Sequence, residues 1–198
     1  MSKSLGNSLL LSDLLDKYSP ETVKFALLST NYRGDINVTD ALFPEAEKHM
    51  ADFYAVIKAA RDKGIKIAGE NKAIDDEFNS AMDDDFNTAL ALSSLFGYFK
   101  AAKAKIAAGD NSVGADINQI INTYSLLGLF QTDADEFLNS VKEKTASDIP
   151  EEVKAIAEER LACRKEKNWA KSDELRDKIA ALGYEIKDAK DGYTLTKK

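Results

Sequence analysis

The sequence predicts a mainly α-helical fold: an antiparallel helical bundle followed by a small α+β domain, made of a helical hairpin and a β-hairpin. Over most of the first 130 residues, apolar side chains recur every three or four positions, which is the spacing of one helix face. Only near the C-terminus do apolar and polar side chains alternate, as they do in half-buried strands. Helical stretches joined by short polar loops favour an antiparallel bundle.

Local signals place the helices of the bundle. Ser19 followed by Pro20 marks a helix start, because serine caps helices and proline suits the first helical position. Thr39 is a second candidate cap, for the helix that runs to about Lys63. In the helix from about Thr88 to Ala108, Phe96 is expected to face the core. The predicted helices cover Pro20 to Leu28, Thr39 to about Lys63, Asp75 to Met82, about Thr88 to Ala108, and the apolar stripe from Ile117 to Leu127.

A polar stretch after the bundle predicts a domain boundary. Beyond it, helices are expected from Pro150 to about Lys167 and from Trp169 to Leu182. Asp191-Gly192 between two alternating segments is typical of a β-hairpin turn. We therefore divide the chain into a connecting segment, a helical bundle, a linker and a C-terminal domain, with the boundaries 1–19, 20–138, 139–149 and 150–198.

Composition excludes several classes of protein. The 198 residues contain no apolar run long enough for a membrane span and no signal-peptide pattern. One cysteine and one histidine exclude a disulfide framework and almost exclude a Cys/His zinc site. The net charge of −7 argues against a nucleic-acid partner. However, residues 1–150 carry −8 and residues 151–198 carry +1, so the last quarter is not acidic.

Candidate catalytic groups are few. His49 lies on an apolar helix stripe and is interpreted as a core or boundary residue. Cys163 follows a helical pattern without a second histidine to activate it, which favours a packing role. The run Asp83 to Asp85 is interpreted as a negative helix N-terminus. A complete enzyme working through Cys163 or through this run stays open as an alternative.

The C-terminal helical hairpin combines one tryptophan with many cations. Seven basic and four acidic residues lie between Arg160 and Lys178, around Trp169. Such a surface could stack an unpaired base on the indole and read its edge with a carboxylate. The alternative, which composition alone favours, is that Trp169 is a core residue and that the charges form a solvated helix face.

Several segments resemble, in order, bacterial cysteinyl-tRNA synthetases, a family of class I aminoacyl-tRNA synthetases. Met1 to Asn7 matches the end of the KMSKS-type signature and its continuation, and the tail matches the end of that family. The resemblance covers essentially the whole chain. The other matching segments are Ser12 to Tyr18, Glu21 to Ser29, Asn31 to Arg33, Ala81 to Thr88, Arg160 to Asp177 and Gly183 to Asp188.

The resemblance implies a C-terminal piece of the enzyme that starts inside the signature. Residues 20–138 would be a bundle of the class I anticodon-binding type. Lys3 resembles the signature lysine that steadies the ATP phosphates, and without its nucleotide-binding domain we expect it to be disordered and inactive. The parent enzyme would use ATP and bind one zinc ion. This chain is expected to hold neither cofactor and to be inactive alone.

The implied partner is the cysteine tRNA, whose anticodon is GCA. By resemblance, Trp169 stacks on a base, Arg164 donates hydrogen bonds to the anticodon, and Asp173 and Asp188 accept them from base edges. Leu195 stands where family members commonly have tryptophan, so the resemblance assigns it no contact.

The remaining expectations concern the setting of the chain. The resemblance implies a second partner, the N-terminal catalytic domain of the same protein, together with a monomeric state and a cytoplasmic location. Arg164 to Ile179 also resembles the helical hairpins that join nucleotide-excision-repair subunits. A protein-interaction module is therefore the alternative function.

Overall fold

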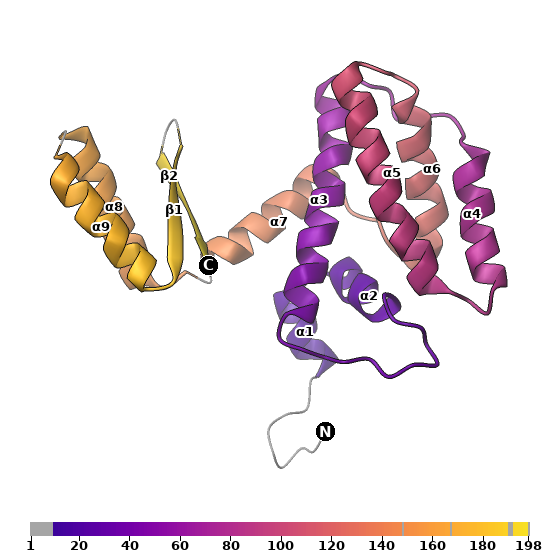
Figure 1. Ribbon diagram of the computed structural model, residues 1–198, viewed down its shortest axis with the longest axis horizontal. Coiled ribbons are helices and arrows are strands. Elements are labelled where there is room, and N and C mark those ends of the chain that lie inside the picture. Colours follow the sequence, from indigo (N-terminus) through magenta and orange to yellow (C-terminus); the bar gives the residue numbers. More distant parts are fainter. Residues whose placement is uncertain (1–9, 148, 167, 190–191, 198) are drawn as a thin grey trace, which may run out of the picture. The chain divides into compact units, whose positions relative to one another are not determined.

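The chain folds into two compact units that divide between Asn139 and Ser140 (Figure 1). Among the described residues, no helix has both the length and the apolar character needed to cross a membrane. A computed structural model describes residues 10–147, 149–166, 168–189 and 192–197.

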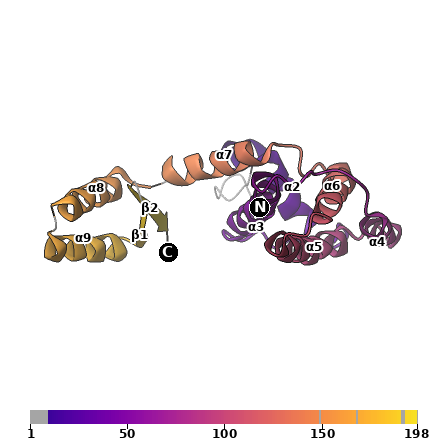
Figure 2. The same ribbon diagram turned by 90° about the horizontal axis from the view of Figure 1, so that it is seen from above.

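The first unit is a helical bundle. Helix α5 packs against α2, α3, α4 and α6, and Figure 2 shows it between α3 and α4. The elements are α1 (Leu11–Lys17), α2 (Pro20–Leu28), α3 (Leu42–Asp62), α4 (Lys72–Asp83), α5 (Thr88–Ala108), α6 (Val113–Tyr124), the 3₁₀ helix η2 (Ser125–Leu127) and α7 (Ala134–Ser147), which crosses the boundary between the units.

Aromatic rings fill the centre of this bundle. Phe53 of α3 stacks on Phe99 of α5 with ring centroids 4.6 Å apart, and Tyr54 stacks on Phe137 of α7 at 4.3 Å. Phe130 packs against three of these rings, those of Phe53, Tyr54 and Phe99. Burial of this aromatic surface contributes to the stability of the unit, together with the buried aliphatic side chains around it.

The predicted cap of α2 and the predicted bounds of α2 and α5 are confirmed. The Ser19 Oγ accepts a hydrogen bond from the Thr22 backbone N–H at 3.1 Å, with Pro20 at the first helical position. Asn87 caps α5 by accepting from the Leu90 N–H. Gly109 ends α5 in the left-handed conformation (φ 73°), which glycine adopts without a Cβ clash.

The bundle departs from the expectations at three points. Helix α3 begins at Leu42 rather than after a Thr39 cap, because Thr39 only accepts a turn hydrogen bond from the Leu42 N–H through its backbone carbonyl. Phe96 lies at the edge of the core, since its ring packs edge to face on the buried Phe25 and Phe53 rings but is 43% exposed. Helix α1 lies inside the segment that was expected only to connect, with Leu14 buried against the bundle.

The segment predicted as a linker, residues 139–149, is largely helical, because α7 continues to Ser147. Its start is capped by the Asp133 carboxylate, which accepts from the backbone N–H of Asp135 at 2.9 Å. Alanine, glutamate, leucine and lysine in this segment all favour helix. Polarity alone therefore did not indicate an irregular segment.

The second unit packs a helical hairpin against a β-hairpin. It contains α8 (Glu151–Lys165), α9 (Trp169–Ala181), β1 (Tyr184–Ala189) and β2 (Gly192–Lys197), and the strands are antiparallel, with Ile186 opposite Leu195. These elements confirm the predicted helical hairpin and β-hairpin, although Asp191 of the predicted turn lies outside the described residues. The core consists of Ile149, Val153, Ala157, Ile179, Tyr184, Ile186 and Leu195.

Candidate nucleic-acid interface

The turn between α8 and α9 presents Trp169 to solvent. Trp169 is the first residue of α9 and is 55% exposed. The Asn168 side chain caps this helix by accepting from the Lys171 N–H at 3.3 Å. The capped helix start holds the indole at the surface, so the structure contradicts the alternative that Trp169 is a core residue.

Arg164 connects Trp169 to Asp188. Its guanidinium carbon lies 5.5 Å from the centroid of the indole ring, a cation–π contact. The same guanidinium forms an ion pair with Asp188 of β1, with 3.2 Å between Nη1 and Oδ2. Three of the residues named from the sequence thus belong to one contiguous cluster, formed by α8, α9 and β1.

Asp188 is held by a second arginine that the sequence analysis did not single out. Arg160, 2% exposed, donates to the Asp188 carboxylate through Nη1 at 2.6 Å and Nη2 at 3.3 Å. This hydrogen bonding, together with the charges of Arg160, Arg164 and Arg176, lowers the pKa of Asp188. The available sequence signal was spacing, since residues four apart on α8 share a face.

Asp173 lies one turn after Trp169 on the exposed surface of α9. The four-residue spacing puts both side chains on the same helix face. Within the described parts of the chain, its carboxylate makes no hydrogen bond or ion pair, so its oxygens face solvent as acceptors. Lys3, the remaining residue named from the sequence, lies outside the described residues.

The alternative catalytic groups do not form an active site in the described parts of the chain. Cys163 is buried within the second unit and forms no disulfide. Asp83 ends α4, and Asp85 lies in the turn before α5, where Arg33 and the Tyr32 hydroxyl bind its carboxylate at 2.8 and 2.9 Å. The run is therefore a helix C-terminus and a turn, not the helix N-terminus that was expected.

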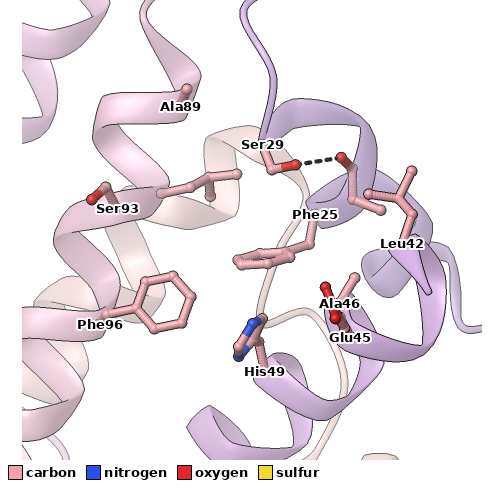
Figure 3. A pocket seen from close by; sticks show the side chains of 11 residues that line it. Phe25, Ser29, Leu42, Glu45, Ala46, His49, Ala89, Ser93 and Phe96 are labelled. Atoms are coloured by element: carbon pink, nitrogen blue, oxygen red, sulfur yellow. Dashed lines mark hydrogen bonds between the residues drawn. The ribbon is translucent and has the colours of Figure 1, made fainter. Parts of the chain in front are cut away.

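His49 is half-buried at the edge of the bundle, as expected for a boundary residue. It lines a hollow of about 310 Å³ together with Phe25 of α2 and Phe96 of α5 (Figure 3). The His49 and Phe96 rings meet edge to face, with centroids 4.9 Å apart. Across the described residues, no group of three or more His, Cys, Asp or Glu side chains is arranged to hold a metal ion.

Comparison with known families divides the chain into three matching segments. Residues 77–131 match the DALR domain, and residues 146–194 match the cysteinyl-tRNA ligase anticodon binding domain. Residues 1–48 match the class I (C) tRNA synthetase catalytic domain. The anticodon-binding match at 146–194 contains Arg160, Arg164, Trp169, Asp173 and Asp188.

Curated relatives match along nearly the whole chain. Cysteine–tRNA ligase of Azotobacter vinelandii is 36% identical over 203 aligned positions, which cover 98% of this chain and 41% of that protein. The ligase of Pseudomonas aeruginosa is 34% identical over 98% of this chain and 41% of its own length. That of Desulfotalea psychrophila is 35% identical over 97% and 44%.

This chain thus spans about two-fifths of the length of these relatives. The family matches follow one another along the chain in the order catalytic, DALR and anticodon-binding, and the relatives align across all three. The chain belongs to the cysteinyl-tRNA ligase family and contains the family's DALR and anticodon-binding domains.

Proposed function

We propose that the chain binds the cysteine tRNA and reads its anticodon with the second unit. The observation that supports this most directly is the exposed indole of Trp169 beside the Arg164–Asp188 pair. Unpaired bases are recognised by surfaces that combine an exposed aromatic ring for stacking with hydrogen-bond donors and acceptors for the base edge.

Each member of the cluster has a distinct proposed role. Trp169 stacks on a base, an interaction worth about 1–3 kcal/mol per base. Asp173 and Asp188 accept hydrogen bonds from base N–H groups, and guanine offers two adjacent donors of this kind. Arg164, which only donates, contacts base carbonyl or ring-nitrogen acceptors.

Within this proposal, the chain supplies recognition and the catalytic domain of the full-length ligase supplies the chemistry. That chemistry is formation of cysteinyl-adenylate from cysteine and ATP, followed by transfer of cysteine to the tRNA. Lys3 is proposed to contact the ATP phosphates only when that domain is present. The zinc ion, the monomeric state and the cytoplasmic location remain parts of the same proposal.

The alternative function, a protein-interaction module, is less well supported. A helical hairpin that pairs with a partner needs an apolar face left open for it. On α9, however, Leu175 and Ile179 are buried inside the unit, Ile179 as a member of its core. The exposed face presents Trp169 and Asp173 instead.

Titration with labelled cysteine tRNA at low salt tests the proposed function. We expect tighter binding to the transcript with the GCA anticodon than to one with a changed anticodon. Trp169→Ala should weaken binding to the GCA transcript by about tenfold or more, because one stacking contact is lost. Leu182→Ala, an exposed apolar residue after the other end of α9, is the matched control. Equal affinity of the unmodified chain for both transcripts would remove the proposal.

A further inference from the structure

Arg160 is a buried charged side chain on α8, and its burial needs an explanation. Arginine is rarely buried unless it is paired. Here both terminal nitrogens donate to Asp188, at 2.6 and 3.3 Å, while the buried Nε has no acceptor among the described residues. An apolar side chain of similar size would fill this space without leaving a buried donor unpaired. Stability of the core alone therefore does not account for an arginine at this position.

The contacts of Arg160 lead to the exposed cluster. Arg160 binds Asp188, Asp188 forms an ion pair with Arg164 at 3.2 Å, and the Arg164 guanidinium lies over Trp169 at 5.5 Å. The Asp188 side chain is 40% exposed. A carboxylate has about four acceptor sites, so two arginines leave room for a donor from a ligand.

We infer that Arg160 is a positioning residue for anticodon reading: it fixes the Asp188 carboxylate and, through it, holds Arg164 over Trp169. This inference rests on the proposed function. Groups that are held in place before binding lose less side-chain entropy when the ligand arrives. They also offer donors and acceptors at fixed positions, which discriminates between bases.

The test uses Arg160→Met, which removes the hydrogen bonds and keeps an apolar side chain of similar length. Lys154→Met is the control, since it removes one positive charge from the same helix, where Lys154 pairs with Glu151. Arg160→Lys is the second variant, because it keeps the positive charge but cannot make the bidentate hydrogen bonds to the Asp188 carboxylate. Thermal unfolding establishes that each variant is folded before binding is measured.

Tryptophan fluorescence gives a readout that a purely structural role would not move. Trp169 is the single tryptophan of the chain, so its emission reports the position of Arg164 directly. Arg160→Met is expected to change the emission in the same direction as Arg164→Met does. In the double variant, the Arg160 substitution should add nothing further, since its effect passes through Arg164.

Anticodon discrimination is the functional readout. The ratio of affinities for the GCA transcript and a changed one should fall about tenfold in Arg160→Met, the effect expected when one well-placed base contact is lost. Lys154→Met should leave this ratio unchanged. If Arg160→Met does not fold, Arg160→Lys decides, and it should lower the ratio and alter the emission in the same way.

The outcomes separate this inference from the proposed function. If the unmodified chain does not discriminate between anticodons, the proposed function fails whatever the variants do. If it does discriminate, and a folded Arg160 variant keeps both the affinity ratio and the Trp169 emission, the positioning role is overturned. A lower ratio with unchanged emission also overturns it, because the effect would then not pass through Arg164.

Discussion

Glu21 links α2 to the segment that precedes α7. Its carboxylate is 3% exposed. It accepts from the backbone N–H groups of Phe130, Gln131 and Thr132 at 2.7, 3.0 and 2.9 Å, and from the Tyr54 hydroxyl at 2.7 Å. Phe130 adopts a left-handed conformation (φ 57°), and the hydrogen bond from its N–H to Glu21 stabilises this unusual backbone. A buried charge with this many donors is fully satisfied.

Glu21→Gln should lower the free energy of unfolding by about 3 kcal/mol. The amide keeps one acceptor oxygen and places an N–H₂ group against donors, so several buried donors lose their partner. Chemical denaturation of the first unit measures this. Glu70→Gln, an exposed site, should change stability by less than about 0.5 kcal/mol. Equal changes in the free energy of unfolding for the two substitutions would show that the buried hydrogen bonds of the Glu21 carboxylate do not stabilise the unit.

Asp188 gives the second unit an acid-sensitive contact. The Arg160 hydrogen bonds lower its pKa below the ordinary value of 3.8, so the folded state favours the ionised form. The unfolded state binds the proton more readily, and stability therefore falls as the pH drops below about 4. At neutral pH the contribution is fully present. Asp188→Asn should reduce the acid-side loss of stability, followed by Trp169 emission between pH 5 and pH 2. An unchanged pH profile in this variant would exclude the ion pair as its source.

Side-chain roles differed in how far the sequence predicted them. Trp169 was named from the composition of the hairpin as well as from the family resemblance, and Arg164 and Asp188 were named from the resemblance. The structure brings all three into one cluster. Arg160 was not singled out, because arginine is usually exposed and the residue type gives no sign of burial. Glu21 was missed for a different reason: its partners lie 33 to 111 residues away, so no local pattern marks them.

At the scale of elements, helices with strong end signals were predicted well. Ser19 with Pro20 marks the start of α2 as expected, and α5 has the predicted bounds, with Asn87 and Gly109 at its two ends. Such signals work because they satisfy backbone groups within a few residues. Helix α7 was missed because its cap, Asp133, was not recognised and because much of the segment after the cap is polar. Whether such a polar segment is a helix or an irregular linker therefore depends on the cap at its start, not on its composition.

Asp133→Ala should weaken the start of α7. The substitution removes the acceptor for the Asp135 N–H and the ion pair to Arg61 at 2.6 Å. Loss of an N-cap costs about 1 kcal/mol, so the amides of the first turn of α7 should exchange with solvent about fivefold faster. Hydrogen exchange measures this. Asp62→Ala breaks an ion pair with Lys58 but caps no helix, and it should leave these rates unchanged. Equal acceleration in both variants would show that charge, not capping, holds the helix start.

At the scale of the molecule, folding units and family matches do not share boundaries. The catalytic-domain match extends over residues 1–48, into α3, while α2 and α3 pack within the same bundle as the DALR segment at 77–131. The bundle is therefore one folding unit assembled from two family segments. The second unit contains the whole of the anticodon-binding match at 146–194 and is the less acidic part of the chain.

Several basic residues of the α8–α9 hairpin are paired with acidic side chains. Lys171 binds Glu159 at 2.7 Å, Lys178 binds Glu174 at 2.7 Å, and Arg160 and Arg164 share Asp188. Paired cations neutralise few phosphates. Tight anticodon reading by this unit would therefore depend on stacking and hydrogen bonding more than on charge.

The salt dependence of tRNA binding tests this balance. With about two phosphates neutralised, the logarithm of the binding constant should fall with the logarithm of salt concentration with a slope of about −2. Glu159→Gln releases Lys171, two residues after Trp169, and should tighten binding and steepen the slope by about 0.7 to 0.9. Glu151→Gln releases Lys154 at the other end of α8 and should change neither. A slope near −6 in the unmodified chain would mean that the acidic bundle also contacts phosphates, and that the second unit does not act alone.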